Sequence, residues 1–486
     1  MEKISADVYA RYRRLSGDDV HFLMGMDEHG QKVAQAAAAR GVSPQAQVDQ
    51  IAALFQQMWA SLTISYDQFI RTTSPAHQQG VRALLDRIFE ESPDAFYERS
   101  YEGWYCVGCE AFKTEAEIEG GQCVLHPTRT LEWVTERNWF FRLSHYTEFL
   151  KAHLAAHPDF VYPDTRRNEI LALLDRGLED VSASRARQSW GIPFPRPTSD
   201  GVQQTTYVWF DALPNYLTAT GYPSPGFEHR WPADVHFVGK DITRFHCVIW
   251  PAMLHAAKLP LPRAVWAHGF VTSSGDKLSK SAGVRIDLGD AIDRHGPDAF
   301  RYFLMREVPF NGDGEFSLER LDERYVADLA NAFGNLASRA IAMVERYRDS
   351  VVPPGPNAAV LAADSADYAR YHEFMGGQGG YLPHEALRAV WATVARGNEY
   401  VDREAPWKLA KDPAQHRALD TVLATLIHQL ADQAIHLAPF IPERAEALWR
   451  QLGGPGSVHD QRFGAAVDAT GWRVAKGDPL FPKAKD

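Results

Sequence analysis

Apolar side chains in the first part of the chain alternate between helical and strand-like spacing. The first predicted helix repeats them at Ile4, Val8, Tyr12 and Leu15. The elements predicted after it are strand 20–25, helix 33–39, helix 48–62, strand 69–73 and helix 77–88. This alternation predicts an α/β fold with a parallel sheet. A strand should precede the first helix of a doubly wound sheet, and the sequence shows none there.

The second half of the chain repeats the pattern and then changes to helices alone. A strand followed by a helix is expected over 206–216, and a second strand over 235–241. The helix after that strand places Ile242, His246 and Ile249 on one face. From about residue 325 the spacing is helical, through 329–344, 387–400 and 419–437. A mixed α/β part is therefore followed by an all-helical part.

Three of the four cysteines fall within one short window. Cys106 and Cys109 are followed by Cys123 and His126, which is the pattern C-x2-C-x13-C-x2-H. Two such pairs have the spacing of a tetrahedral zinc site, and four protein ligands make the zinc structural rather than catalytic. The alternative is three unrelated buried cysteines. Cys247 lies in an apolar run and reads as a small core residue.

Two loops offer cationic groups after predicted strands. Residues 277–281 (KLSKS) follow a strand and a turn, and two ammonium groups three residues apart suit a triphosphate. Taken alone, this loop is better interpreted as a solvated surface loop, because such short motifs match by chance. The predicted strand at 235–241 ends in a loop of Gly239, Lys240 and Asp241. Gly239 allows the backbone to approach a ligand closely, Lys240 offers a positive charge, and Asp241 can accept hydrogen bonds from sugar hydroxyls.

Other polar residues have a structural and a functional interpretation. Asp27 and His29 follow a strand, where ligands of such sheets bind, but a polar loop explains them too. His246 alone would be a satisfied core histidine. On the helices, Asn335 and Arg339 could donate hydrogen bonds to unstacked bases of a single strand, and Trp407 could stack on such a base. The alternative is ordinary packing within a helical bundle.

The composition narrows these alternatives only slightly. A hydrophobic content of 45% and a charged content of 23% are those of an ordinary globular protein of about three domains. The net charge of −11 argues against a protein whose whole surface is basic and binds nucleic acid. A local basic patch can still bind nucleic acid on an acidic protein. We expect no membrane helix, no signal peptide and, with four cysteines, a cytoplasmic protein.

Over essentially its whole length the chain resembles the methionyl-tRNA synthetases, which are class I aminoacyl-tRNA synthetases. The single C-x2-C/C-x2-H site is part of the resemblance, and KLSKS is similar to the family's KMSKS signature. The other matching motifs are 25–30 (GMDEHG), 69–73 (FIRTT), 207–212 (YVWFDA), 237–242 (FVGKDI), 335–339 (NLASR), 406–407 (PW) and 479–483 (PLFPK). Each motif is modest alone, whereas their number and order make the match specific.

The resemblance implies a role for individual residues. Asp27 would bind the ammonium group of methionine. The pocket for the methionine side chain would be lined by Trp209, Ala212, Tyr216, Ile242 and His246. The residues of the ATP site would be Gly239, Asp241, His268, Lys277, Ser279 and Lys280. Lys277 and Lys280 would stabilise the triphosphate while methionyl-adenylate forms, with Lys240 near the reacting groups. Asn335, Arg339 and Trp407 would read the CAU anticodon of tRNA(Met).

The resemblance also implies the domain plan and the cofactors. The expected parts are a Rossmann-type catalytic domain at 1–96 and 205–265, an inserted zinc-binding connective domain at 97–204, a KMSKS-loop and stem-contact region at 266–325, and an all-α anticodon-binding bundle at 326–486. One structural zinc per chain is implied by Cys106, Cys109, Cys123 and His126. ATP with Mg²⁺, L-methionine and tRNA(Met) are the implied substrates. Because no further domain follows the PLFPK motif, we expect a monomer.

One family motif is missing from the sequence. The HIGH-type signature should lie just upstream of residues 2–4, and no His-x-Gly-His occurs near Met1. Either the start was placed too far downstream, or the protein has lost part of its ATP site. The alternative function is therefore a catalytically impaired, tRNA-binding protein on a synthetase scaffold. A synthetase for an aliphatic amino acid is disfavoured, because 71–207 has room only for the zinc domain. Poor discrimination against homocysteine by pocket fit predicts proofreading.

Overall fold

The chain folds into two compact units, each built from separate stretches of sequence. The computed structural model describes residues 1–486 except 108, 110, 274–275, 278–287, 378–379 and 483–486. The mixed unit comprises His21–Trp59 and Tyr66–Ala267, and the helical unit comprises Met1–Val20, Ala60–Ser65 and His268–Asp486. No helix within the described ranges has the length and apolar character needed to cross a membrane.

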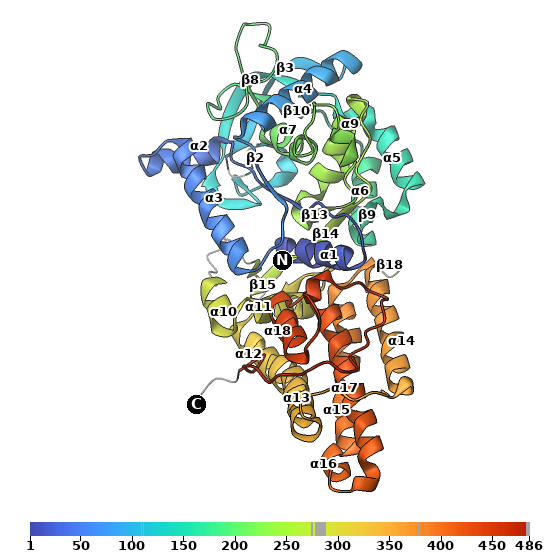
Figure 1. Ribbon diagram of the computed structural model, residues 1–486. Helices are drawn as coiled ribbons and strands as arrows, with labels where there is room; N and C mark the ends of the chain where they lie inside the picture. The colour runs from blue at the N-terminus through green and yellow to red at the C-terminus, as the bar shows by residue number, and fades with distance from the viewer. Residues whose placement is uncertain (108, 110, 274–275, 278–287, 378–379, 483–486) are drawn as a thin grey trace. The chain divides into compact units, whose positions relative to one another are not determined.

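Two sheets in the mixed unit carry the expected order of strand and then helix (Figure 1). Strand β1 (Leu23–Met26) runs parallel to β2 (Gln68–Arg71), with Leu23 opposite Gln68. The second sheet has the order β13 (His236–Gly239), β14 (Val265–His268) and β9 (Val161–Tyr162), and β14 is parallel to β9. The strand pairs β1–β2 and β14–β9 both run parallel, as the predicted α/β fold requires.

Helices follow these strands as the apolar spacing predicts. After β1 come α2 (Gln31–Ala39) and α3 (Pro44–Ser61), and after β2 comes α4 (Pro75–Glu91). Ser74 caps α4 by accepting from the backbone N–H of His77. The core packs α4 against α9 (Trp250–Ala256) and neighbouring segments. Its fully buried members on these two helices include Val81, Leu84, Leu85, Ile88, Trp250 and Met253.

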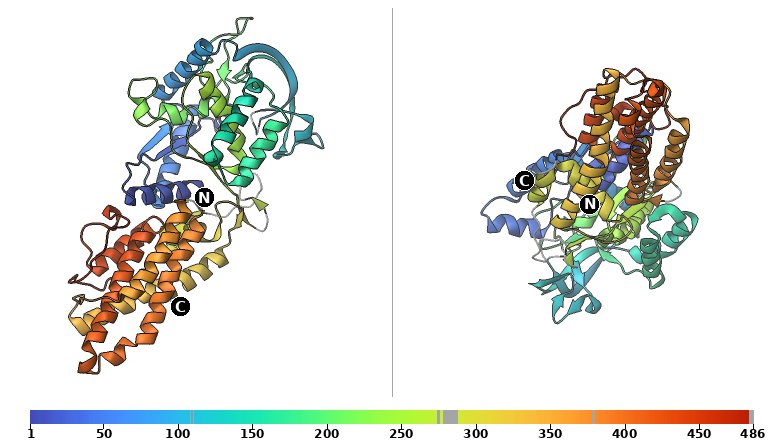
Figure 2. Two further views of the ribbon diagram at one scale, coloured as in Figure 1. Left: turned by 90° about the vertical axis from the view of Figure 1, so that its right-hand side faces the viewer. Right: turned by 90° about the horizontal axis from the view of Figure 1, so that it is seen from below.

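A long antiparallel ribbon extends the mixed unit. Strands β3 (Phe96–Cys106) and β8 (Glu132–Phe141) pair from Phe96 opposite Phe141 to Tyr105 opposite Glu132, and Figure 2 shows the ribbon strongly curved. β4 (Ala111–Lys113) and β10 (Val181–Ser182) flank this pair. A small sheet of β5 (Ile118–Glu119), β6 (Gln122–Cys123) and β7 (His126–Thr130) follows. The ribbon thereby carries the cysteine window at its far end.

Short elements complete the mixed unit, and one of them differs from expectation. A strand and then a helix were expected over 206–216, and the strand is only β12 (Thr205–Thr206), because α7 (Val208–Ala212) begins two residues later. The unit also contains α5 (Thr147–Ala156), α6 (Asp164–Asp175), β11 (Ser184–Arg185) and α8 (Asn215–Thr218).

The helical unit contains a bundle of long helices (Figure 1). Its main members are α13 (Asn335–Arg348), α14 (Ala358–Phe374), α15 (Pro383–Glu404), α17 (His416–Leu437) and α18 (Pro442–Leu452). Before the bundle come α10 (Leu288–His295), α11 (Pro297–Glu307) and α12 (Leu318–Arg324), then a π-helical stretch, Tyr325–Gly334. α16 (Pro406–Leu409) is a single turn. Smaller strands are β15 (Val271–Ser273), β16 (Asp276–Lys277), β17 (Gly314–Glu315), β18 (Met375–Gly377) and β19 (Gly380–Tyr381).

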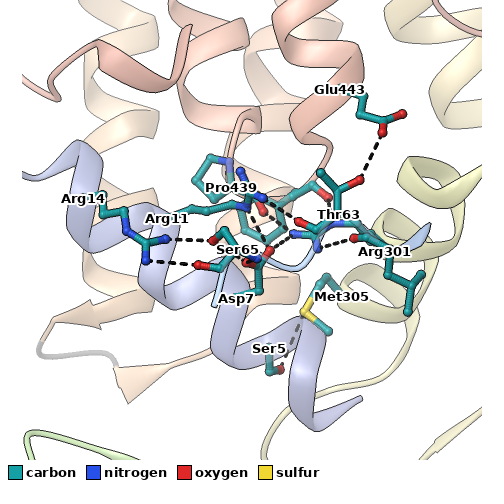
Figure 3. A network of polar contacts seen from close by, with 12 residues as sticks. Ser5, Asp7, Arg11, Arg14, Thr63, Ser65, Arg301, Met305, Pro439 and Glu443 are labelled. Carbon is teal, nitrogen blue, oxygen red and sulfur yellow. Dashed lines mark hydrogen bonds and ion pairs between the residues drawn. The ribbon is translucent and has the colours of Figure 1, made fainter. Parts of the chain in front are cut away.

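A buried ion pair ties the N-terminal helix into the helical unit (Figure 3). Asp7 of α1 (Glu2–Leu15) lies 2.6 Å from the guanidinium of Arg301, and both side chains are fully buried. Asp7 also accepts from Arg11 Nε at 2.8 Å and from the backbone N–H of Ser65 at 2.7 Å. Burial opposes ionisation, but these donors and cations outweigh it and lower the pKa of Asp7. The short stretch Ala60–Ser65 is thereby fastened to α1.

Candidate active site and metal centre

The loop after β1 is held by buried polar contacts. Glu28 is fully buried, accepts from Arg71 Nε at 2.5 Å and also accepts from the Thr73 hydroxyl. Its backbone carbonyl accepts from Trp190 Nε1 at 2.7 Å. Asp27, just before it, is exposed and accepts from Asn215 Nδ2 at 3.4 Å. The loop therefore presents the Asp27 carboxylate from a fixed backbone.

Behind this loop lies a buried histidine–aspartate–histidine cluster. Asp211 is only 1% exposed, and its two oxygens lie 2.6 Å from His29 Nδ1 and 3.0 Å from His77 Nε2. The Thr218 hydroxyl lies 2.8 Å from His77 Nδ1. Burial opposes ionisation of Asp211, but the two imidazole hydrogen bonds outweigh it and lower its pKa. The carboxylate is thus an ionised acceptor between two imidazoles.

Aromatic and histidine side chains gather on α7, α8 and the segment after β13. The Tyr216 hydroxyl lies 2.7 Å from His246 Nε2, and His246 Nδ1 lies 3.0 Å from the carbonyl of Ile242. Trp209 stacks on Phe245, with ring centroids 3.7 Å apart. Ala212, 6% exposed, ends α7. We call Trp209, Ala212, Tyr216, Ile242 and His246 the aromatic cluster.

The protonation of the aromatic cluster follows from its contacts. The Ile242 carbonyl can only accept, so His246 Nδ1 donates to it, and in the neutral imidazole Nε2 accepts from the Tyr216 hydroxyl. His236 stacks on Tyr216 with centroids 3.9 Å apart. Burial, with a contribution from His246, lowers the pKa of His236 well below its usual value. The cluster therefore combines aromatic faces with a hydrogen-bonded polar edge.

The residues expected at the ATP site lie in different stretches of the chain. Gly239 ends β13, and Lys240 and Asp241 begin the short helical turn Lys240–Ile242. His268 ends β14 and is 9% exposed, with Nδ1 2.6 Å from the Gly269 carbonyl. The backbone of Lys277 pairs in β16, opposite Thr272 of β15. The side chain of Lys277, together with Ser279 and Lys280, lies outside the described residues.

The cysteine window closes into a four-ligand cluster. Cys106 ends β3, Cys123 ends β6 and His126 begins β7. The ligand atoms of these residues and Cys109 all lie within 4.8 Å of one another. Cys109 Sγ is 3.5 Å from Cys123 Sγ and 3.1 Å from His126 Nδ1. A tetrahedral zinc with bonds of about 2.0–2.3 Å separates its ligands by roughly 3.3–3.8 Å, so the cluster fits that ion.

The electrostatics of the cysteine window also suit a cation. Burial, and then the Cys123 thiol, raise the pKa of Cys109 to about 12. The four cysteines of the chain are free rather than disulfide-bonded. A divalent cation would supply the positive charge that several thiolates in one small space require.

The expected anticodon residues lie in the helical unit. Asn335 begins α13 and is exposed, and Arg339 is four residues further on the same helix. The Arg339 guanidinium lies 5.9 Å from the ring centroid of Trp407, which is 39% exposed on α16. Arg339 also pairs with Asp402 at 2.9 Å. The structure brings Arg339 and Trp407 together, as a cation over an accessible ring.

Several side chains of these sites were not predicted. His77, Asp211, His236 and Phe245 received no role from the sequence. A signal for Asp211 was present, since it lies within the YVWFDA motif between Trp209 and Ala212. For His77 no signal was present, because it reads as one of the polar residues of an amphipathic helix.

Comparisons with known proteins agree with this arrangement. The family model described as tRNA synthetases class I (M) matches residues 1–341, and that described as the anticodon binding domain of methionyl tRNA ligase matches 353–486. The methionine–tRNA ligase of Thermosynechococcus vestitus is 42% identical over 99% of this chain and 93% of that protein. That of Caldanaerobacter subterraneus subsp. tengcongensis is 42% identical over 99% of this chain and 75% of that protein.

A solved structure is similar over nearly the same length. Mycobacterium tuberculosis methionyl-tRNA synthetase bound by methionyl-adenylate has a TM-score of 0.92 and 39% identity, over 99% of this chain and 96% of that chain. Two family models that together span most of the sequence, full-length relatives and a shared fold point to one conclusion. The chain belongs to the methionine–tRNA ligase family of class I aminoacyl-tRNA synthetases.

Proposed function

We propose that this methionine–tRNA ligase holds methionine at the aromatic cluster, with Asp27 binding the substrate ammonium. The observation that carries the proposal is the Tyr216–His246–Ile242 chain of hydrogen bonds beside the Trp209–Phe245 stack. A thioether packs favourably against aromatic rings. Exposed Asp27 supplies the complementary charge for the ammonium.

The proposal places ATP, with Mg²⁺, at the residues after β13 and in the KLSKS stretch. Gly239 and Asp241 meet adenosine, and His268 and Ser279 complete the nucleotide site. Lys277, Lys280 and Lys240 stabilise charge as the methionine carboxylate attacks the α-phosphorus and pyrophosphate leaves. The protein mainly positions the reactants and stabilises developing charge, since it forms no covalent bond in this step.

The adenylate is then consumed by the terminal ribose hydroxyl of tRNA(Met). In this proposal Asn335, Arg339 and Trp407 contact the anticodon, with Trp407 offering a face on which a splayed base can stack. Cys106, Cys109, Cys123 and His126 hold one structural zinc, which stabilises the end of the ribbon. The protein acts as a cytoplasmic monomer, which sedimentation of purified protein and fractionation of cells would check.

Methionine-dependent ATP–pyrophosphate exchange tests the proposal. The assay is run on this chain and on a form carrying the in-frame codons upstream of Met1. Asp27→Asn is expected to raise the KM for methionine at least tenfold with little change in the KM for ATP. Lys280→Ala is expected to lower kcat by about a hundredfold or more, because a charge-stabilising group is lost.

The control for both variants is Asp290→Asn, an exposed carboxylate on α10, which should leave both parameters unchanged. Exchange that depends on another amino acid, or the absence of exchange from both forms of the chain, would contradict the proposal. The comparisons do not favour the impaired tRNA-binding alternative, and an inactive but tRNA-binding extended form is the result that would support it.

A further inference from the structure

One ring nitrogen of His29, two residues after Asp27 in the loop that follows β1, takes no part in the contacts described above. His29 contacts Asp211 through Nδ1 at 2.6 Å, and its ring meets the edge of Trp190 with centroids 5.3 Å apart. No residue in the described part of the chain hydrogen-bonds to His29 Nε2. This atom is also not among the polar atoms that are sealed from solvent. His29 is therefore buried except at the nitrogen that points away from Asp211.

The contact with Asp211 determines which ring nitrogen of His29 carries a proton. Ionised Asp211 can only accept, so both His29 Nδ1 and His77 Nε2 donate to it. The Thr218 hydroxyl, 2.8 Å from His77 Nδ1, donates to that atom and so stabilises the tautomer that His77 needs. With a proton on Nδ1, an imidazole in its neutral form offers a lone pair at Nε2.

Asp27 and His29 are held by the same segment. Asp211 and Asn215 are four residues apart where α7 leads into α8, which places them on one face. Asp211 binds His29, while Asn215 donates to Asp27 at 3.4 Å. The loop after β1 therefore presents a carboxylate and an imidazole lone pair, two residues apart, from one fixed support.

We propose that His29 Nε2 is a second acceptor for the ammonium group of the amino-acid substrate, beside Asp27. An ammonium has three N–H donors, and one carboxylate does not satisfy them all. Asp211 and His77 are positioning residues, because they fix the tautomer and ring orientation of His29 without reaching the substrate. The inference rests on the proposed methionine site.

Paired ligands separate this role from a structural one. Binding of L-methionine and of 4-(methylthio)butanoate, which lacks the amino group, is measured by calorimetry on the full chain. His29→Phe keeps a ring against Trp190 and removes the acceptor. It is expected to weaken methionine binding about tenfold or more and to leave the deaminated acid unchanged. His29→Gln, which can place an amide oxygen near the same point, should recover part of the loss.

Asp211→Asn tests the positioning role. Its amide N–H₂ forces one imidazole to accept, and a His29 that accepts at Nδ1 would present an N–H to the ammonium. This variant should also weaken methionine selectively. His229→Phe, at an exposed histidine in the same unit, is the matched control and should change neither ligand. Each variant is judged by the ratio of its affinities for the two ligands. Partial misfolding lowers both affinities alike and therefore does not produce the expected result.

Two results would overturn the inference. One is an unchanged affinity of folded His29→Phe for methionine. The other is an equal loss of affinity for methionine and for the deaminated acid, which would show that His29 has a structural role. If Asp27→Asn weakens methionine but His29→Phe does not, the proposed site stands and this inference alone fails. If the unaltered, upstream-extended chain binds no methionine, both fail together.

Discussion

Buried carboxylates recur at the residue scale, and their partners decide what each one does. Asp7 and Asp211 are both almost fully buried, at 0% and 1% exposure. Asp7 faces guanidinium groups and ties segments together, whereas Asp211 faces two imidazoles and orients them. Neither role is visible in the sequence, because Arg301 and His29 are far from their partners along the chain.

Asp7→Asn should destabilise the helical unit strongly. The substitution leaves the Arg301 cation buried without its counter-charge, which costs about 3–5 kcal/mol. Urea unfolding at pH 7, followed by circular dichroism, measures the loss. Asp18→Asn is the control, since the Asp18–Arg13 pair is 42% exposed on both sides and is worth less than about 1 kcal/mol.

Acid should remove the advantage that Asp7 confers. Because the folded-state pKa of Asp7 is lowered, its stabilisation is fully present above the unfolded value of about 4 and is lost as pH falls through the folded value. The difference between the wild type and Asp7→Asn should therefore shrink in acid. A difference that stays constant from pH 7 to pH 3 would contradict an ionised Asp7.

Asp432 on α17 should have the opposite pH dependence. Burial, and then the Asp364 carboxylate, raise the pKa of Asp432 to about 7. Since the folded value exceeds the unfolded value of about 4, its contribution is present below pH 4 and is lost as pH rises towards 7. Asp432→Asn should raise the melting temperature relative to the wild type at pH 8 and have a smaller effect at pH 5. Equal shifts at both values would contradict this assignment.

At the element scale, close packing of α4 on α8 supports the Asp211 cluster. A Cβ added at Gly80 would lie 2.4 Å from Thr218 Cγ2 and 3.1 Å from the Tyr222 carbonyl. Gly80 lies on α4 three residues after His77, and Thr218 is the residue that hydrogen-bonds to His77. The glycine thus sets the distance at which the two helices share this contact.

Gly80→Ala should be destabilising despite the better helix propensity of alanine. The propensity gain is about 1 kcal/mol, whereas forcing a methyl group into occupied space typically costs about 1–3 kcal/mol. We expect a net loss of stability and a raised KM for methionine, because displacement of Thr218 disturbs His77. Gln79→Ala, at the exposed neighbouring position of α4, is the control, because it changes helix propensity without adding a methyl group to the packed interface. A stabilised Gly80→Ala with unchanged KM would show that the helices separate freely.

The cysteine window should bind one zinc per chain. Three two- to five-residue strands form its small sheet, which is too little structure to be stable alone. Cys123→Ser should abolish bound zinc, measured by atomic absorption, and increase hydrogen exchange in β5–β7. Cys247→Ser removes a thiol elsewhere and should leave the zinc content at one. Zinc retained by Cys123→Ser would exclude this residue as a ligand.

How much could be predicted differs between elements. Spacing of apolar residues predicted β1, β2, β13 and the helices α13, α15 and α17, because it repeats with the period of a strand or a helix. It could not separate a two-residue strand such as β12 from the start of α7, since one apolar run serves both. The cysteine spacing predicted its cluster because its ligands are close in sequence. The His29–Asp211 contact spans 182 positions, and only the folded chain reveals it.

At the scale of the whole molecule, the two units share one interleaved chain. The helical unit is assembled from Met1–Val20, Ala60–Ser65 and His268–Asp486. Ile4, Val8 and Leu15 of α1 are buried, and the Tyr381 hydroxyl donates to the Ser5 carbonyl at 2.7 Å. The C-terminal stretch alone therefore lacks part of its core.

A fragment of residues 268–486 should fold poorly by itself. It loses the apolar face of α1 and leaves Arg301 without Asp7, so its melting temperature should fall well below that of the same unit in the full chain. Adding a peptide of residues 1–20 should raise the melting temperature, and the same peptide with Asp7→Asn should do so less. Full stability of the isolated fragment without peptide would show that α1 is dispensable.

The interleaved chain also bears on synthesis at the ribosome. α1 emerges early, yet Arg301 and Tyr381, which contact it, follow only after His268. At roughly 5–20 residues per second, the helix waits on the order of ten to fifty seconds with its apolar face uncovered. During that interval nascent α1 is a natural client for chaperones. Slowing elongation downstream of α1 should therefore lower the yield of native protein more than slowing it after residue 440.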